Sequence, residues 1–158
     1  IELVLSRHIH ASNRQSPSEA IFQFELYASI RGIFKSSNIA NRHVLAEARS
    51  VEDGRRLDII VSNGVKYGYE LKVNQLTRKA ITDAAAQADG YRKLLQIDAM
   101  LLVNFVHNGH QIDPVYQIDA YPKVQIVLVR FPDSFDKYTM QLEGAQEVES
   151  RCVMCVGE

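Results

Sequence analysis

Two carboxylates and one amine lie inside short apolar segments of this chain. Asp58 lies within the run 57–61, and Glu70 and Lys72 lie within the run 69–73. Burying an ionised carboxylate without a partner is costly, so such positions usually hold paired or metal-bound groups. Residues two apart on a strand share a face, so Glu70 and Lys72 project the same way, about 7 Å apart. An acid and an amine therefore point into one space.

These residue types suit hydrolysis of a phosphate ester. Asp58, Glu70 and the Leu71 carbonyl form an all-oxygen ligand set suited to Mg²⁺, for which Mn²⁺ can substitute. Zinc is disfavoured because no His or Cys joins them. A hydrated Mg²⁺ acidifies and positions a water, while cations stabilise the charge that grows on the phosphate oxygens. Lys72 would orient that water or, if its pKa is lowered, accept its proton.

The geometry depends on the turn between the two segments. Asn63-Gly64 is a strong hairpin signal. A strict two-residue turn would pair Ser62 with Val65 and point Asp58 away from the face of Glu70. We therefore predict a three-residue loop over 62–64, with Gly64 in the left-handed region and Val61 paired with Val65. A regular two-residue hairpin would count heavily against the site.

Helices and strands must bring these groups together. A capping box at Ser16-Pro17-Ser18-Glu19 predicts a helix that continues to about Phe34. A second helix is predicted over 77–96, with small alanines that let it approach a sheet closely. Strands are predicted at 43–49, 56–61, 66–73, 99–106 and 123–131, with an edge strand at 138–142. The order predicts an α/β fold, a mixed β-sheet flanked by helices.

Composition sets the class of protein. The chain has 158 residues, 46% of them apolar and 23% charged, which is typical of one globular domain. We expect a single domain over 1–158, with its core at about 16–131. No apolar run approaches the roughly 20 residues that span a bilayer. The chain begins at Ile1, so we expect it to be a piece of a longer protein.

The net charge of −1 hides an asymmetry along the chain. Residues 1–93 carry 14 Lys/Arg and 10 Asp/Glu, whereas residues 94–158 carry 4 and 9. On charge alone, chance clustering on an ordinary solvated surface is the favoured explanation. For the cationic side chains, a solvated face and a nucleic-acid surface are equal alternatives. The residues that we expect to contact a nucleic acid, if there is such a surface, are Arg55, Arg56, Arg78, Lys79, Tyr91 and Arg92.

The spacing of the charged residues resembles a known motif. Asp58, eleven intervening residues and then Glu70-x-Lys72 are similar to the PD-(D/E)XK nuclease superfamily, and the element order matches over about 16–131. The resemblance implies a restriction-endonuclease-like αβββαβ core. It also implies that Asp58 and Glu70 are metal ligands and that Lys72 is the catalytic lysine. Leu57 stands where a proline sometimes precedes the aspartate, which is a common departure.

The same resemblance assigns two residues on the helices. Glu25 matches an extra acid of the first helix that binds a metal directly or through water. Gln87, with Tyr91 one turn later, matches a polar position of the second helix that supports the site. Glu19 is the rival to Glu25, but its place in the capping box already accounts for it. Glu47 is a weaker rival.

A narrower similarity is visible in four short segments, 22–27, 54–58, 67–71 and 121–124. They resemble the nuclease-like C-terminal domains of Crinkler effectors. The resemblance implies an NTPase module upstream in the same polypeptide and action in the nucleus of a host cell.

These observations predict a Mg²⁺-dependent endonuclease that acts on DNA, with RNA as the other candidate substrate. A homodimer is left open. The alternative is an inactive module that binds nucleic acid or regulates a larger effector. For the charged residues themselves, the alternative is a cross-strand ion pair on a solvated sheet, which contributes little to stability.

Overall fold

The computed structural model of the chain describes residues 18–36, 43–49, 56–112, 117–133, 137–141 and 148–151. Its elements alternate as the sequence predicts, and the α/β class is confirmed. In chain order they are α1 (Glu19–Ser36), β1 (His43–Arg49), β2 (Arg56–Ser62), β3 (Lys66–Val73), α2 (Arg78–Leu94), β4 (Ala99–His107), β5 (Val124–Phe131), β6 (Lys137–Gln141) and β7 (Val148–Arg151). The strand β7 was not predicted.

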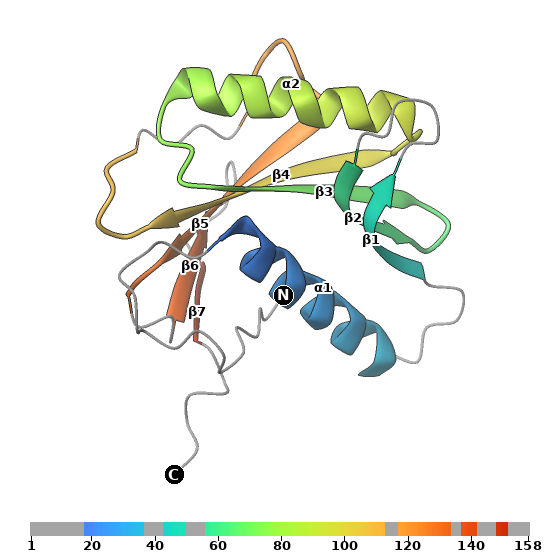
Figure 1. Ribbon diagram of the computed structural model, residues 1–158, viewed down its shortest axis with the longest axis horizontal. Helices are drawn as coiled ribbons and strands as arrows, with labels where there is room; N and C mark the ends of the chain where they lie inside the picture. Colours follow the sequence, from blue (N-terminus) through green and yellow to red (C-terminus); the bar gives the residue numbers. More distant parts are fainter. Residues whose placement is uncertain are drawn as a thin grey trace.

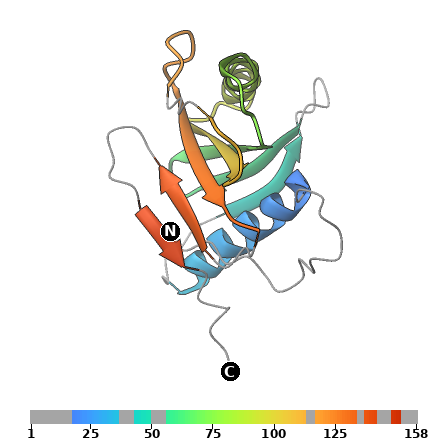
Figure 2. The same ribbon diagram turned by 90° about the vertical axis from the view of Figure 1, so that its left-hand side faces the viewer.

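The strands form one mixed sheet in the order β1-β2-β3-β4-β5-β6-β7. The central strands β3, β4 and β5 run parallel, and the pairs on either side of them are antiparallel. Figures 1 and 2 show α1 on one face of the sheet and α2 on the other. No helix in the described part of the chain has the length and apolar character needed to cross a membrane.

The face of the sheet under α1 is packed with large apolar side chains. Phe22 stacks on Phe105 with ring centroids 4.3 Å apart. Leu26 and Ile30 continue the contact along the helix, and Leu71 belongs to the same buried cluster. Ser16 and Pro17 lie outside the described residues, so the predicted capping box cannot be followed there.

The face under α2 is packed with smaller side chains. Ala84, Ala85 and Ala88 lie against the sheet in a second buried cluster. Gly68 belongs to this close approach, because a Cβ at that position would lie 2.7 Å from Met100 Sδ. The helix begins after Thr77, whose Oγ1 accepts a hydrogen bond from the backbone N–H of Ala80 at 3.1 Å.

The β2–β3 hairpin has the predicted parity but a different register. Ser62 pairs with Lys66 and Val61 pairs with Tyr67, so the loop is 63–65. The predicted Val61–Val65 pair is therefore wrong by two residues. Gly64 has a φ of 100°, in the region that favours glycine, as the sequence predicts. A shift of two residues keeps each paired side chain on its face, and the step beyond the Ile59–Tyr69 pair brings Asp58 opposite Glu70.

Candidate active site

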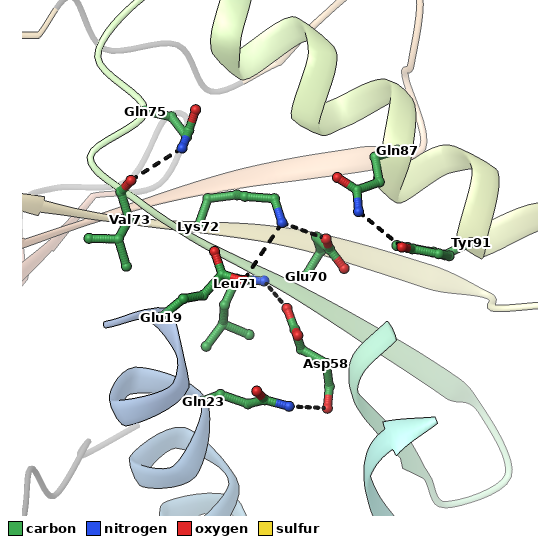
Figure 3. Close-up of polar contacts among 10 residues, drawn as sticks. All are labelled: Glu19, Gln23, Asp58, Glu70, Leu71, Lys72, Val73, Gln75, Gln87 and Tyr91. Carbon is green, nitrogen blue, oxygen red and sulfur yellow. Dashed lines mark hydrogen bonds and ion pairs between the residues drawn. The ribbon is translucent and has the colours of Figure 1, made fainter. Parts of the chain in front are cut away.

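The candidate site forms where the β2–β3 ladder stops. The last paired residues are Ile59 and Tyr69. One residue further, Asp58 Oδ2 accepts a hydrogen bond from the backbone N–H of Leu71 at 2.7 Å (Figure 3). The N–H and C=O of a strand residue point to the same side, so the Leu71 carbonyl also points toward β2 and Asp58. The side chain of Asp58 thus replaces a strand carbonyl, and it brings the carboxylate beside the predicted carbonyl ligand.

The backbone of β1 and β2 is distorted next to Asp58. The β1–β2 register includes Ala46–Ile59 and Ala48–Leu57 but skips the residues between them. Glu47, which lies opposite Asp58, has a φ of 53°, uncommon for a residue with a side chain. Leu57 packs in the α2 cluster whereas Ile59 packs in the α1 cluster, although strand residues two apart normally share a face.

Glu70 and Lys72 form the second half of the site. Lys72 Nζ lies 2.7 Å from Glu70 Oε1. Glu70 is only 2% exposed, and its other oxygen, Oε2, is buried without a hydrogen-bond partner among the described residues. A buried carboxylate oxygen without a partner carries a desolvation cost, so this atom is suited to receive a ligand or a proton.

The buried acids are held in an environment that disfavours their charge. Burial raises the pKa of Glu70 to about 7, although the ammonium of Lys72 opposes the shift. Burial also raises the pKa of Asp58, against the lowering effects of the Leu71 N–H and of Lys72. Burial alone would lower the pKa of Lys72, but the carboxylates of Glu70, Glu19 and Asp58 together raise that pKa above its ordinary value. Lys72 therefore stays a cation, which favours orientation of water and charge stabilisation over proton acceptance.

The acid that α1 brings near Lys72 is Glu19, whereas Glu25 was predicted from the sequence. Glu19 Oε1 lies 3.9 Å from Lys72 Nζ (Figure 3). Glu25 is buried nearly two turns further along the helix, about 9 Å along its axis. No hydrogen bond or ion pair among the described residues joins Glu25 to Asp58, Glu70 or Lys72. A difference of six residues also rotates Glu25 to another side of the helix.

Gln23 is a contact that the sequence reasoning missed. Its Nε2 donates a hydrogen bond to the backbone carbonyl of Asp58 at 3.2 Å. Gln23 follows Glu19 by four residues, so both lie on the same side of α1. This four-residue spacing was the sequence feature that could have indicated that Gln23 lies near the site. Together the two side chains tie the first turns of α1 to β2 and β3.

Gln87 and Tyr91 interact with each other on α2. Gln87 Nε2 donates to the Tyr91 hydroxyl at 2.9 Å, and Figure 3 shows this pair apart from the bonds of Asp58. In the described part of the chain, no hydrogen bond links Gln87 to the three charged groups. Tyr91 is 7% exposed and packs in the α2 cluster. Core packing covers most of the ring, and the expected role of Tyr91 as a nucleic-acid contact stays a prediction.

The arginine and lysine residues predicted to contact nucleic acid differ in their exposure and in whether they form ion pairs. Arg92 is engaged by Asp89 at 2.8 Å and is largely covered. Arg56 pairs with Glu47, and Lys79 pairs with Asp83 one turn away, and both cations stay exposed. Arg78 is exposed at the start of α2, and Arg55 lies outside the described residues.

The donor set fits a hard divalent cation. Asp58, Glu70 and Glu19 bring three carboxylates near one ammonium, which leaves an excess of negative charge when all are ionised. In the regions that the structure describes, no three His, Cys, Asp or Glu side chains converge as a complete metal site. A metal would thus rest on Asp58, Glu70 and the Leu71 carbonyl with water in its other positions, as Mg²⁺ commonly does. The unpaired Oε2 of Glu70 agrees with such an ion.

The comparisons with known proteins add little. No protein-family model matches the chain, and no curated protein matches it. A solved structure, the half-complex of Thermococcus gammatolerans McrB AAA+ hexamers with bound McrC, contains a chain with 16% identity and a TM-score of 0.45. The match covers 72% of this chain and 28% of that chain. At this TM-score it carries no argument about fold or function.

Proposed function

We propose that this protein is a Mg²⁺-dependent nuclease that hydrolyses phosphodiester bonds in DNA. The observation that carries the proposal is the convergence of Asp58, Glu70 and Lys72 at the point where β2 and β3 separate. An ion pair on a solvated sheet would be exposed. Glu70 is instead almost fully buried, and one of its oxygens has no partner among the described residues. That arrangement supports a binding site rather than a structural ion pair.

Each side chain has a distinct role in this proposal. Asp58 and Glu70, with the Leu71 carbonyl, hold the metal, which acidifies a water when bound. Lys72 keeps its positive charge and stabilises the charge that develops on the phosphate oxygens. Glu19 positions the Lys72 ammonium from α1, and Gln23 holds the backbone at Asp58.

The family assignment is part of the same proposal. The element order and the Asp58…Glu70-x-Lys72 spacing support membership of the PD-(D/E)XK superfamily. DNA is preferred over RNA because of this resemblance. The Crinkler-like origin, the upstream NTPase module and action in a host nucleus depend on the similarity of short segments, and they stay predictions.

The experiment is a cleavage assay with plasmid and single-stranded substrates, in Mg²⁺ or EDTA. We expect Mg²⁺-dependent cleavage that falls by about 100-fold or more in Lys72→Ala, because a group that stabilises transition-state charge is lost. Asp58→Asn keeps an acceptor for the Leu71 N–H and should lose activity while folded. Lys66→Ala, on the exposed start of the same strand, is the matched control and should cleave normally. If the wild type binds nucleic acid without Mg²⁺-dependent cleavage, the inactive binding module replaces this proposal.

A further inference from the structure

A polar pocket of about 650 Å³ opens at the carboxyl ends of β4 and β5, and the proposed chemistry does not use it. In sheets with parallel strands, ligands commonly bind at this edge. The described residues that line the pocket are Leu76, Asn108, His110, Gln111, Ile112 and Arg130.

The lining of the pocket is rich in hydrogen-bond donors. Arg130 is the formally charged side chain among the lining residues, with one imidazole and two amides around it. Arg130 Nη1 donates to the His110 carbonyl at 3.2 Å, which orients the guanidinium. Asp133, three residues after Arg130, lies 2.8 Å from His107 Nε2 and is not among the described lining residues. The pocket therefore favours an anion that accepts several hydrogen bonds.

The pocket and the candidate active site share one face of the sheet. Lys72 pairs with Asn104 across β3 and β4, and Val106 pairs with Arg130 across β4 and β5. Alternation places Lys72, Asn104 and Arg130 on the face under α2. Arg130 is two strands across and two residues along from Lys72, so their Cα atoms lie about 12 Å apart by standard sheet spacing.

Partly buried hydrogen bonds hold the chain segment between the candidate active site and the pocket. Asn104 is 2% exposed. Its Oδ1 accepts from the Gln75 N–H at 3.1 Å, and its Nδ2 donates to the Gln75 carbonyl at 2.9 Å. Asn74 Oδ1 accepts from the His107 N–H at 3.1 Å. The chain that leaves the catalytic strand is thus fixed to β4 next to the pocket.

We propose that this pocket binds a phosphodiester group of the substrate strand, a few nucleotides from the phosphate at Lys72. The proposal rests on the proposed function for its substrate class. Arginine and amide side chains are among the groups that contact nucleic-acid phosphates. A phosphodiester bound in the pocket would fix the direction and register of the nucleic-acid strand across the α2 face. Cleavage would then depend on nucleotides that extend from the cleaved bond toward the pocket.

The test measures binding rather than cleavage. Fluorescence anisotropy of labelled oligodeoxythymidylates is recorded in EDTA over a range of salt concentrations. We expect Arg130→Gln to weaken binding and to reduce the slope of log K against log[salt] by about 0.7, the value for one phosphate contact on a single strand. Arg130→Lys restores the charge and should restore the slope, even if the bond to His110 is altered. Arg31→Gln, on α1, is the matched control and should resemble the wild type.

Several outcomes overturn the proposal. Arg130→Gln with the wild-type slope, or a wild type that binds no oligonucleotide, contradicts it. In a competition experiment, inorganic phosphate and unlabelled oligonucleotide are compared at equal concentrations of phosphate. If the two displace the labelled oligonucleotide equally well, the pocket is assigned to the free anion instead. A wild type that fails to cleave DNA but shows the Arg130 effect would overturn the proposed nuclease activity and leave this pocket assigned.

Discussion

The two faces of the sheet are built on different principles. Under α1 the contact is mainly apolar, with Phe22 stacked on Phe105 and close to Phe131, although α1 also buries Glu25 and Ser29. Under α2 the apolar contact with small alanines covers one part of the sheet, and a row of polar groups that includes Lys72 and Asn104 crosses the rest. The same strands supply both faces, because successive side chains point to opposite sides.

We expect the face under α1 to contribute mainly to folding stability and the face under α2 to carry the proposed chemistry. Large side chains packed without voids contribute most of the folding free energy. Buried charged groups contribute little or destabilise, and they persist where other requirements hold them. We therefore expect substitutions under α1 to change the free energy of unfolding, and substitutions in the polar row to change activity and pH dependence.

The largest effect on stability is expected for Phe22→Ala. Removing this fully buried ring should lower the free energy of unfolding by about 3–5 kcal/mol, because transfer and cavity costs add. Phe24→Ala is the matched control, since Phe24 is 65% exposed on the same helix, and it should change that free energy by less than about 0.5 kcal/mol. Urea unfolding measures both. Equal losses in the two variants would contradict the description of the α1 face.

The second effect is the pH dependence that Glu70 imposes. Its pKa rises from 4.5 to about 7 on folding, so between these values the folded state binds more protons than the unfolded state. Stability therefore falls as the pH rises through this window, by about 3 kcal/mol in total. Urea unfolding in EDTA, at about pH 5 and about pH 8, measures it.

Glu70→Gln and added metal are the controls for this pH effect. The variant should lose this part of the pH dependence, because the amide does not titrate. Added Mg²⁺ should reduce the dependence in the wild type, since a bound cation favours the carboxylate. A pH dependence that is unchanged in Glu70→Gln would assign it to other groups.

The third effect concerns the clamp behind the polar row. Asn104→Ala leaves the partly buried N–H and C=O of Gln75 without their Asn104 partners and should cost about 1–3 kcal/mol. Gln75→Ala keeps both of these bonds, because Gln75 contributes them from its backbone, and should cost less. Thermal and urea unfolding of the two variants decide the order. The reverse order would show that the clamp is not a source of stability.

The smallest effect distinguishes the two acids of α1. Glu19→Gln should reduce the cleavage rate by up to about 5-fold, since a half-exposed ion pair contributes at most about 1 kcal/mol. Glu25→Gln should leave the rate unchanged, because Glu25 has no hydrogen bond or ion pair to the site among the described residues. Initial rates in Mg²⁺ provide the measurement. A larger loss in Glu25→Gln would restore the assignment made from the sequence.

Local patterns predicted the described elements except β7, and they singled out Asp58, Glu70 and Lys72. Strand composition gave β1 and β3 their observed bounds, and the Asn63-Gly64 signal, combined with the need for Asp58 to face Glu70, predicted the parity of the hairpin. The exact register was wrong because the position of a three-residue loop depends on tertiary pairing. A shift of two residues conserves faces, so the site survived this error.

The helix contribution could not be predicted in the same way. The capping-box pattern offered a local explanation for Glu19 and removed it from consideration, whereas the structure directs its carboxylate to Lys72. Gln23 binds a backbone carbonyl, which no side-chain motif records. The distortion at Glu47 and the pocket at Arg130 arise from packing between elements distant in the sequence.

The bond from the Leu71 N–H to Asp58 has a consequence for how such a chain diverges over time. Any replacement at this position must still accept that hydrogen bond to preserve the architecture. Asparagine can accept it and cannot supply the negative charge, so a single nucleotide change in an aspartate codon could produce a folded descendant without turnover. Catalytically inactive homologues of this domain should therefore carry asparagine at the position of Asp58 more often than an alkyl side chain.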